Sequence, residues 1–498
     1  MNKSTKHGLA RANPLSSAAV WRTDLLAKRV GTALAGAVLV MAVTAGLVRG
    51  QSAGTVVITP VEATLVTTLH VPVNLSPGDQ IDPHVSGDLA SYTDGTDPQN
   101  IRYYRFSSAV NQAIPSPMGA SDHLSDVSGD KVSFTRNTSI CNAIMVFDVT
   151  TSSTTEVPPA CSNRVAPAIG GNTVAYVDLA TSASAVFAHD LSSLGFGTVQ
   201  LSSGLERAQN PSVAPSGHVV VWEQCASSIV TCDIMKSTHS GGVWSAAAAV
   251  ANTASAESNP DTDGTTVVYD ADRAGNLTGQ DIYWQPVVTG TETQLAIPGF
   301  QLKPSISQGV IGFESRATMF APADIFVYVM ATNTLYQITS TSTVDEQLND
   351  VSVLDNGDIR VVWAANDGLA RDYNIYATTF TPAGVVHYAI CLLYDPTVAR
   401  RSGTVYPIKA QLCDASGNNL SSPEIVVHAV SVTQTSTNIP ANLDDVGNAN
   451  PDFDFRYDAA LGGYIFNLSL RGIATGTYNL NFQAGADPAL HSSPFAVK

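Results

Sequence analysis

The sequence lacks the short motifs that identify several common classes of enzyme. It contains no G-x-S-x-G nucleophile elbow, no H-E-x-x-H, no P-loop and no G-x-G-x-x-G. A serine-hydrolase domain is therefore excluded by motif, and no signature of zinc-protease or nucleotide chemistry is present.

Basic residues are scarce once the first 54 residues are set aside. Those residues hold seven of the 25 Lys and Arg but one of the 42 Asp and Glu, which leaves 18 basic and 41 acidic side chains. So acidic a surface repels phosphate backbones and anionic lipid. We expect no nucleic-acid partner.

Long hydrophobic runs are absent except near the start. A basic stretch ending at Lys28-Arg29 precedes an uncharged, mostly apolar run from Val30 to Val48. Residues 1–53 are predicted to be an export segment. Two outcomes stay open: a signal peptide cleaved near Val43-Thr44-Ala45, or a retained membrane anchor that would be the chain's one contact with a membrane. No Cys follows the run, so a lipoprotein anchor is not expected, and we predict an extracellular or cell-envelope protein.

Cysteine is also rare, and no C-x-x-C pair of a zinc site occurs. The six cysteines fall in three pairs whose members are near each other in sequence. An even count of cysteines outside the cytosol suggests disulfides. We predict three local disulfides: Cys141 with Cys161, Cys225 with Cys232, and Cys391 with Cys413. Buried free cysteines are the alternative.

What the chain does have is a repeat. Turn residues separate four short strand-like segments in each copy, and an aromatic closes the second of them. The aromatics are Tyr92, Phe134, Tyr176, Trp222, Tyr269, Phe313 and Trp363. Their spacing predicts seven four-stranded blades near residues 80–118, 119–161, 162–203, 204–253, 254–297, 298–340 and 341–381. We interpret these aromatics as core between blades.

The repeat has the form P-x-x-S-x-D-G, apolar-x-aromatic, R-x-G-N, D-I-Y, and residues 259–284 match it best. This pattern resembles the WD-like repeats of the TolB-type β-propeller superfamily over roughly residues 80–380. The resemblance implies an all-β, seven-bladed β-propeller. Such propellers serve as protein-docking modules, as appendages of peptidases and occasionally as lyases. TolB's own N-terminal domain has no counterpart here, so its partners are not carried over.

The seventh repeat is one strand short, because a new kind of sequence follows Thr381-Pro382. We predict that Leu65 to Val71 supplies the missing strand and closes the ring, since closure leaves no exposed edge. The propeller would then span residues 54–384.

Residues 385–498 contain seven strand candidates separated by turn residues. They predict a small immunoglobulin-like β-sandwich. The region also resembles the PxKF-type domain of exported bacterial proteins, through Pro407-Ile408-Lys409, the turn after Cys413 and the stretch from Gly447. The family's Phe after the Lys is Ala410 here. The resemblance implies surface attachment or spacing.

Candidate site residues lie where first strands approach the central channel. His84 and His123, with Asp82 and Asp126, could form a metal or acid–base cluster, or simply line a wet channel. One position recurs in the repeats, just before the first-strand proline or its equivalent, but the residue type at it varies. Such variation is expected of a functional site carried by a symmetric scaffold. The residues at this position are Asp82, Leu124, Ala166, Asn210, Asn259 and Lys303.

An acidic turn in the fifth repeat is a calcium candidate. Asp270, Asp272, Asn276 and Asp281 stand at positions 1, 3, 7 and 12 of a run that echoes a calcium loop. An ordinary β-hairpin turn explains the same residues. A second acidic cluster comprises Asp444, Asp445, Asp452 and Asp454.

Two functions from different classes remain open. The first is an exported, non-enzymatic binding or scaffold protein, expected to be a monomer, that holds a protein or glycan partner at the blade-end loops or the channel mouth. The second is a polysaccharide- or oligosaccharide-active lyase or hydrolase at that mouth, although opposed carboxylates cannot be located from sequence.

Overall fold

The computed structural model describes residues 55–60, 62–95, 98–180, 183–192, 195, 197–226, 232–253, 255–273, 279–366, 372–414, 416–435, 439–444 and 451–498. The predicted export segment, Asn276 and Asp445 lie outside these ranges. Within them the regular structure is β-strand, apart from one 3-10 turn, η2 (Pro451–Phe453). No helix of the described part is long and apolar enough to cross a membrane.

Seven antiparallel sheets follow the seven repeats, and we number them as blades 1 to 7. Their first strands are β4 (Gln80–Ser86), β8 (Ser121–Ser128), β12 (Arg164–Gly170), β16 (Arg207–Val213), β21 (Glu257–Thr262), β25 (Phe300–Ser307) and β29 (Asp345–Val353). Their second strands are β5 (Leu89–Asp94), β9 (Lys131–Asn137), β13 (Thr173–Asp178), β17 (Val219–Cys225), β22 (Thr266–Asp272), β26 (Val310–Arg316) and β30 (Ile359–Asn366).

The third strands are β6 (Asn100–Arg105), β10 (Asn142–Asp148), β14 (Ala185–Asp190), β18 (Cys232–Ser240), β23 (Gln280–Pro286), β27 (Asp324–Val329) and β31 (Tyr373–Phe380). The outer strands of blades 1 to 6 are β7 (Val110–Ala113), β11 (Ser153–Glu156), β15 (Thr198–Gln200), β20 (Ala248–Ala251), β24 (Thr293–Leu295) and β28 (Thr334–Gln337). In blade 4, β18 also pairs with the short β19 (Val243–Trp244).

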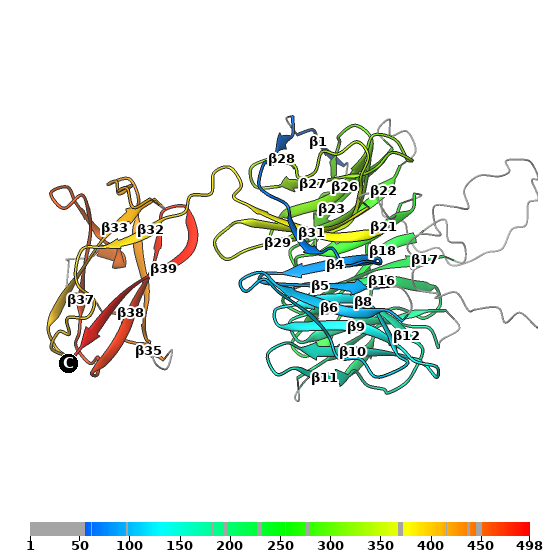
Figure 1. The fold of residues 1–498 in the computed structure, drawn as a ribbon, viewed down its shortest axis with the longest axis horizontal. Coiled ribbons are helices and arrows are strands. Elements are labelled where there is room, and N and C mark those ends of the chain that lie inside the picture. The colour runs from blue at the N-terminus through cyan, green and yellow to red at the C-terminus, as the bar shows by residue number, and fades with distance from the viewer. Residues whose placement is uncertain are drawn as a thin grey trace, which may run out of the picture. The chain divides into compact units, whose positions relative to one another are not determined.

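The sheets form a closed ring. Each first strand contacts the first strand of the next blade, and β29 contacts β4, so blade 7 meets blade 1. Figure 1 shows the successive blades coloured from blue through green to yellow. The β-propeller prediction is therefore confirmed by the sheet order and these contacts.

The segment before blade 1 runs along the outer strands of blades 5 and 6 and supplies the outer strand of blade 7, and we call residues 55–74 the strap. Its strand β1 (Val56–Ile58) is parallel to β24, and β2 (Thr64–Leu65) is parallel to β28. Its last strand, β3 (Val71–Asn74), is antiparallel to β31 and completes blade 7.

The prediction that Leu65 to Val71 closes the ring is wrong in its bounds. Leu65 pairs with Gln337 of blade 6, and of the predicted strand only Val71 pairs with blade 7. The reason is burial: Leu65 and Leu69 are 51% and 80% exposed, whereas Val73 is 5% exposed and packs in the core between blades 7 and 1. The strand that buries an apolar side chain is the one that closes the ring.

The aromatics that close the second strands are buried in all seven blades, at 0 or 1% exposure. Several stack on a ring from the neighbouring third strand, as Tyr176 does on Phe187 and Phe313 on Phe326. The interpretation of these side chains as core is confirmed.

The serine of the repeat motif links neighbouring blades. Ser86 Oγ accepts the backbone N–H of Gly129 at 3.1 Å, and Ser128 Oγ accepts that of Gly171 at 3.1 Å. Across the closure of the ring, Ser352 Oγ accepts the N–H of Gly87 at 2.9 Å. Each of these serines thus satisfies a turn amide of the next blade.

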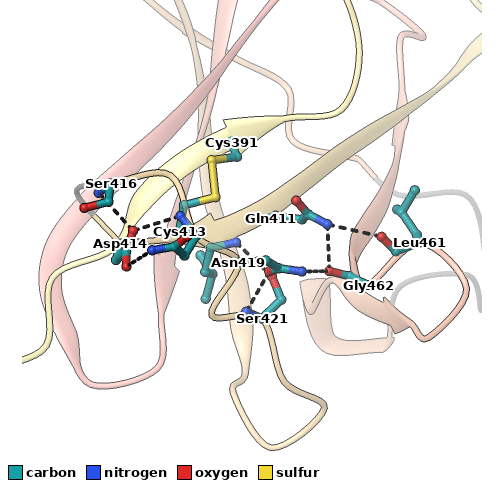
Figure 2. The surroundings of a disulfide bond; sticks show 11 residues. Cys391, Gln411, Cys413, Asp414, Ser416, Asn419, Ser421, Leu461 and Gly462 are labelled. Atoms are coloured by element: carbon teal, nitrogen blue, oxygen red, sulfur yellow. Dashed lines mark hydrogen bonds between the residues drawn. A yellow bond between two sulfur atoms is a disulfide. The ribbon is translucent and has the colours of Figure 1, made fainter.

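The C-terminal region is a sandwich of two four-stranded sheets over one core. One sheet contains β32 (Ala389–Leu392), β33 (Val405–Cys413), β37 (Gly463–Ser469) and β36 (Arg456–Asp458). The other contains β35 (Pro440–Ala441), β34 (Val427–Gln434), β38 (Gly476–Ala484) and β39 (Asp487–Val497). Cys391 and Cys413 join β32 to β33, beside a turn in which Asp414 accepts two backbone N–H groups (Figure 2).

Candidate functional site at the propeller channel

The six positions proposed from the repeat share one backbone feature. All have a positive φ, and so does Leu348 in blade 7, with values from 47° to 57°. The pairing of first and second strands shifts register at each of them, so each is a β-bulge. These seven bulge residues are Asp82, Leu124, Ala166, Asn210, Asn259, Lys303 and Leu348.

The bulge turns its backbone N–H toward the preceding blade. The N–H groups of Leu124 and Ala166 donate to threonine hydroxyls, each at 3.2 Å. Those of Asn259, Lys303 and Leu348 donate to carboxylates, each at 2.8 Å. The acceptor directly follows the core aromatic in these five cases, and it is Thr93, Thr135, Glu223, Asp270 and Glu314 in turn.

In blades 4 to 6 the bulge side chain also bonds to the carboxylate of its own blade. Asn210 Nδ2 donates to Glu223 at 2.8 Å, and Asn259 Nδ2 donates to Asp270 at 2.8 Å. Lys303 Nζ lies 3.0 Å from Glu314. In these three blades the bulge side chain is therefore a hydrogen-bond donor, and its partner is the buried acid on the second strand of the same blade.

The three acids are almost completely buried, at 3% exposure or less. Burial raises the pKa of Asp270 to about 7, against the lowering effect of hydrogen bonds from Asn259, Lys303 and Gln280. A carboxyl group that accepts so many donors is held in one position. Glu223 and Glu314 were not among the site residues predicted from the sequence. The signal was present in the sequence, because each follows its aromatic directly.

Two residues past the bulge, His84 faces three carboxylates. Its ring nitrogens lie 3.8 Å from Asp82, 3.6 Å from Asp126 and 3.5 Å from Asp350. Burial opposes protonation of His84, but these acids outweigh it and raise the pKa of His84 well above its ordinary value. The structure therefore brings together three of the predicted channel residues, and it adds Asp350, which was not predicted from the sequence.

The carboxylates of this channel cluster are also links between blades. Asp350 accepts the N–H of Val85 at 2.8 Å, and Asp126 accepts that of Ile169 at 2.7 Å. The equivalent Asp261 of blade 5 accepts the N–H of Ile306 at 2.7 Å. Burial, together with Asp350, raises the pKa of Asp261 to about 6.

His123 occupies a different position of the repeat from His84. It precedes the bulge Leu124, pairs in register with Thr135, and is 8% exposed. His84 follows its own bulge by two residues, so the two histidines occupy different positions of the repeat.

The residues of the predicted calcium turn lie in the hairpin of β22 and β23. Ala271 pairs with Asp281, and Asp270 pairs with Ile282. Because successive side chains alternate between faces, Asp270 and Asp281 point to opposite faces of the sheet. This register does not let both carboxylates bind one ion. Asp272 ends β22, and Asn276 lies outside the described residues.

All three predicted disulfides are confirmed, joining Cys141 to Cys161, Cys225 to Cys232 and Cys391 to Cys413. Three disulfides indicate that the chain folds in an oxidising compartment.

Comparisons with known proteins give structural neighbours only. No family model and no curated protein matches the chain. A structure from a study of two prolyl endopeptidases has a TM-score of 0.46 at 11% identity, covering 67% of this chain and 53% of that one. The β-propeller domain of the Trilobed protease from Pyrococcus furiosus gives 0.43 at 11%, covering 61% and 94%. TolB from Acinetobacter baumannii gives 0.34 at 14%, covering 59% and 78%.

This chain thus spans about half the length of the endopeptidase chain it resembles. At such TM-scores and identities the neighbours place no site in this chain.

Proposed function

We propose that this chain is an exported, non-enzymatic binding protein that holds a protein partner on one face of the propeller. In an antiparallel blade the loops between second and third strands leave by the same edge as the connections between blades. That edge forms one face of the ring, which we call the loop face.

The observation that carries the proposal is the set of apolar side chains on this face. Met118, Ile140, Leu205 and Phe320 are each at least 85% exposed, and all four lie in these loops or connections. Large apolar side chains held out to water by a rigid scaffold suit a protein contact. The channel groups, in contrast, are occupied by bonds between blades.

A fourfold variant tests the loop face: Met118→Ser, Ile140→Ser, Leu205→Ser and Phe320→Ser. Its matched control is Val243→Ser with Val288→Ser, two exposed residues at the opposite edge. Cross-linking to cell-envelope proteins should capture the same proteins with wild type and control, and lose them with the fourfold variant. Capture by the fourfold variant equal to that of wild type would contradict the proposal.

A second candidate, a polysaccharide- or oligosaccharide-active lyase or hydrolase, draws on the convergence of Asp82, Asp126 and Asp350 around His84. It is weaker, because Asp126 and Asp350 already accept backbone amides of neighbouring blades. Incubation of the protein with a panel of cell-wall and plant polysaccharides tests this enzymatic candidate. Product formed by wild type and lost in His84→Asn would replace the binding proposal.

Calcium and glycan binding are tested in one titration. Thermal unfolding of residues 54–498 is followed with calcium, with EDTA and with oligosaccharides, because a ligand of the folded state raises the melting temperature. A protein-docking propeller predicts no shift with any of them. We assign the C-terminal sandwich, with its resemblance to PxKF-type immunoglobulin-like domains, the role of spacer.

A further inference from the structure

Blade 4 carries a cluster of metal-ligand side chains that the proposed function does not use. Cys225 pairs directly with Cys232 across β17 and β18, and Glu223 stands two residues before Cys225. Side chains two apart in a strand point to the same face, so all three share one face of the sheet. They are 3%, 1% and 6% exposed for Glu223, Cys225 and Cys232.

The ligand atoms of these three residues lie within 4.8 Å of one another. Among the described residues no other group of three His, Cys, Asp or Glu meets that criterion. The other two disulfides therefore lack the arrangement and serve as internal controls.

Glu223 retains room to bind a cation. Its Oε1 accepts two donors, Asn210 Nδ2 and the backbone N–H of Asn259, each at 2.8 Å. Among the residues that the structure describes, its Oε2 accepts one donor, Gln209 Nε2, at 2.6 Å. A carboxylate oxygen takes two partners, so within this part of the chain Oε2 keeps one lone pair for a cation.

We propose that reduction of the Cys225–Cys232 disulfide turns this cluster into a site for one thiophilic divalent cation of the Zn²⁺ type. A dithiol reductant supplies two electrons and becomes a disulfide, the S–S bond breaks, and two thiols form. Metal binding then releases both thiol protons. Two thiolates and a carboxylate, with a solvent ligand, complete a tetrahedral set.

The oxidised chain has no thiolate at this place, so the site is closed in that form. Because the three ligands come from both strands of one hairpin, the cation replaces the disulfide as the link between β17 and β18. It also lies next to Asn259, the bulge residue whose N–H Glu223 accepts.

The test uses the full exported chain, reduced with a dithiol, freed of reductant without oxygen, and titrated with Co²⁺ and then Zn²⁺. We expect one equivalent of Co²⁺ with a thiolate-to-cobalt charge-transfer band, displaced by Zn²⁺, and no band before reduction. Glu223→Gln should weaken Zn²⁺ binding by about tenfold or more. Cys225→Ala with Cys232→Ala should abolish the band.

Three results would overturn the site. They are a folded, reduced chain without the band, an unchanged band in the double-cysteine variant, and an unchanged affinity in Glu223→Gln. Should the cysteine variant not fold, alkylation of reduced wild type decides: Zn²⁺ must protect Cys225 and Cys232, and protection of the other four cysteines alone contradicts the proposal.

Discussion

At the scale of single residues, Glu346 shows what burial does to a carboxyl group. It is 3% exposed and accepts a hydrogen bond from Thr341 Oγ1, at 2.7 Å. Burial raises the pKa of Glu346 to about 8, with Asp324 and Asp345 adding to the effect. The fold therefore favours the protonated form at neutral pH.

This pKa makes stability depend on pH. Because the folded pKa lies above the ordinary 4.5, the stabilisation is complete below that value and is lost as pH rises through about 8. Between about pH 5 and about pH 8 the free energy of unfolding should therefore fall in wild type. In Glu346→Gln the fall over the same range should be smaller by about 1 kcal/mol or more. Urea unfolding at several pH values measures this. The exposed Glu424→Gln is the control, and parallel curves for wild type and Glu346→Gln would refute the assignment.

Gly170 gives a second prediction at this scale. A Cβ atom there would lie 2.0 Å from the carbonyl oxygen of Ala214 in the next blade. We expect Gly170→Ala to cost about 3 kcal/mol or more in chemical denaturation. Gly129→Ala is the matched variant: its Cβ meets nothing within 4 Å, and its φ of 57° should cost about 1 kcal/mol. Equal losses would show that blades 3 and 4 are not closely packed at this point.

At the scale of the blade element, the bulge residue and the acid behind it act as a pair. Blade 2 has Leu124 and Thr135 at these two positions, whereas blade 6 has Lys303 and Glu314. Glu314→Thr alone should cost about 3 kcal/mol, because Lys303 and Arg316 lose a buried partner. The double variant Lys303→Leu with Glu314→Thr copies blade 2 and should recover part of the loss.

A double-mutant cycle measures this coupling by denaturant unfolding. We expect an interaction energy of about 1 to 3 kcal/mol. Additive losses would mean that the side chains at the bulge do not depend on the acid.

The sequence was informative about the elements and less so about their contacts. The aromatics and turn residues predicted the position of every blade, because each blade needs a buried core residue and chain reversals at the same places in the repeat. The β-bulges could not be predicted from residue type. Leu124 and Ala166 adopt a positive φ, although neither Leu nor Ala favours that conformation. Asp350 was missed because its partners, His84 and Val85, lie about 265 residues away and pair only once the ring has closed.

At the scale of the whole molecule, the strap can be tested in two steps. Removing residues 55–75 deletes β3 and the buried Val73, and should lower the melting temperature by on the order of 10 °C. Removing residues 55–69 deletes only β1 and β2 and should have a much smaller effect. Differential scanning calorimetry compares them, and equal melting temperatures for wild type and the longer deletion would show that β3 does not hold the ring closed.

The strap also dictates an order of events during synthesis. Val71 pairs with Ala377, so a strand that emerges early from the ribosome waits for nearly the last strand of the propeller. Closing so long a loop is slow, and until then β31 has an unpaired edge. During this interval that edge can recruit a strand from a second copy. A delay in closing the ring should thus favour oligomers in which β3 of one copy pairs with β31 of another, rather than closed monomers.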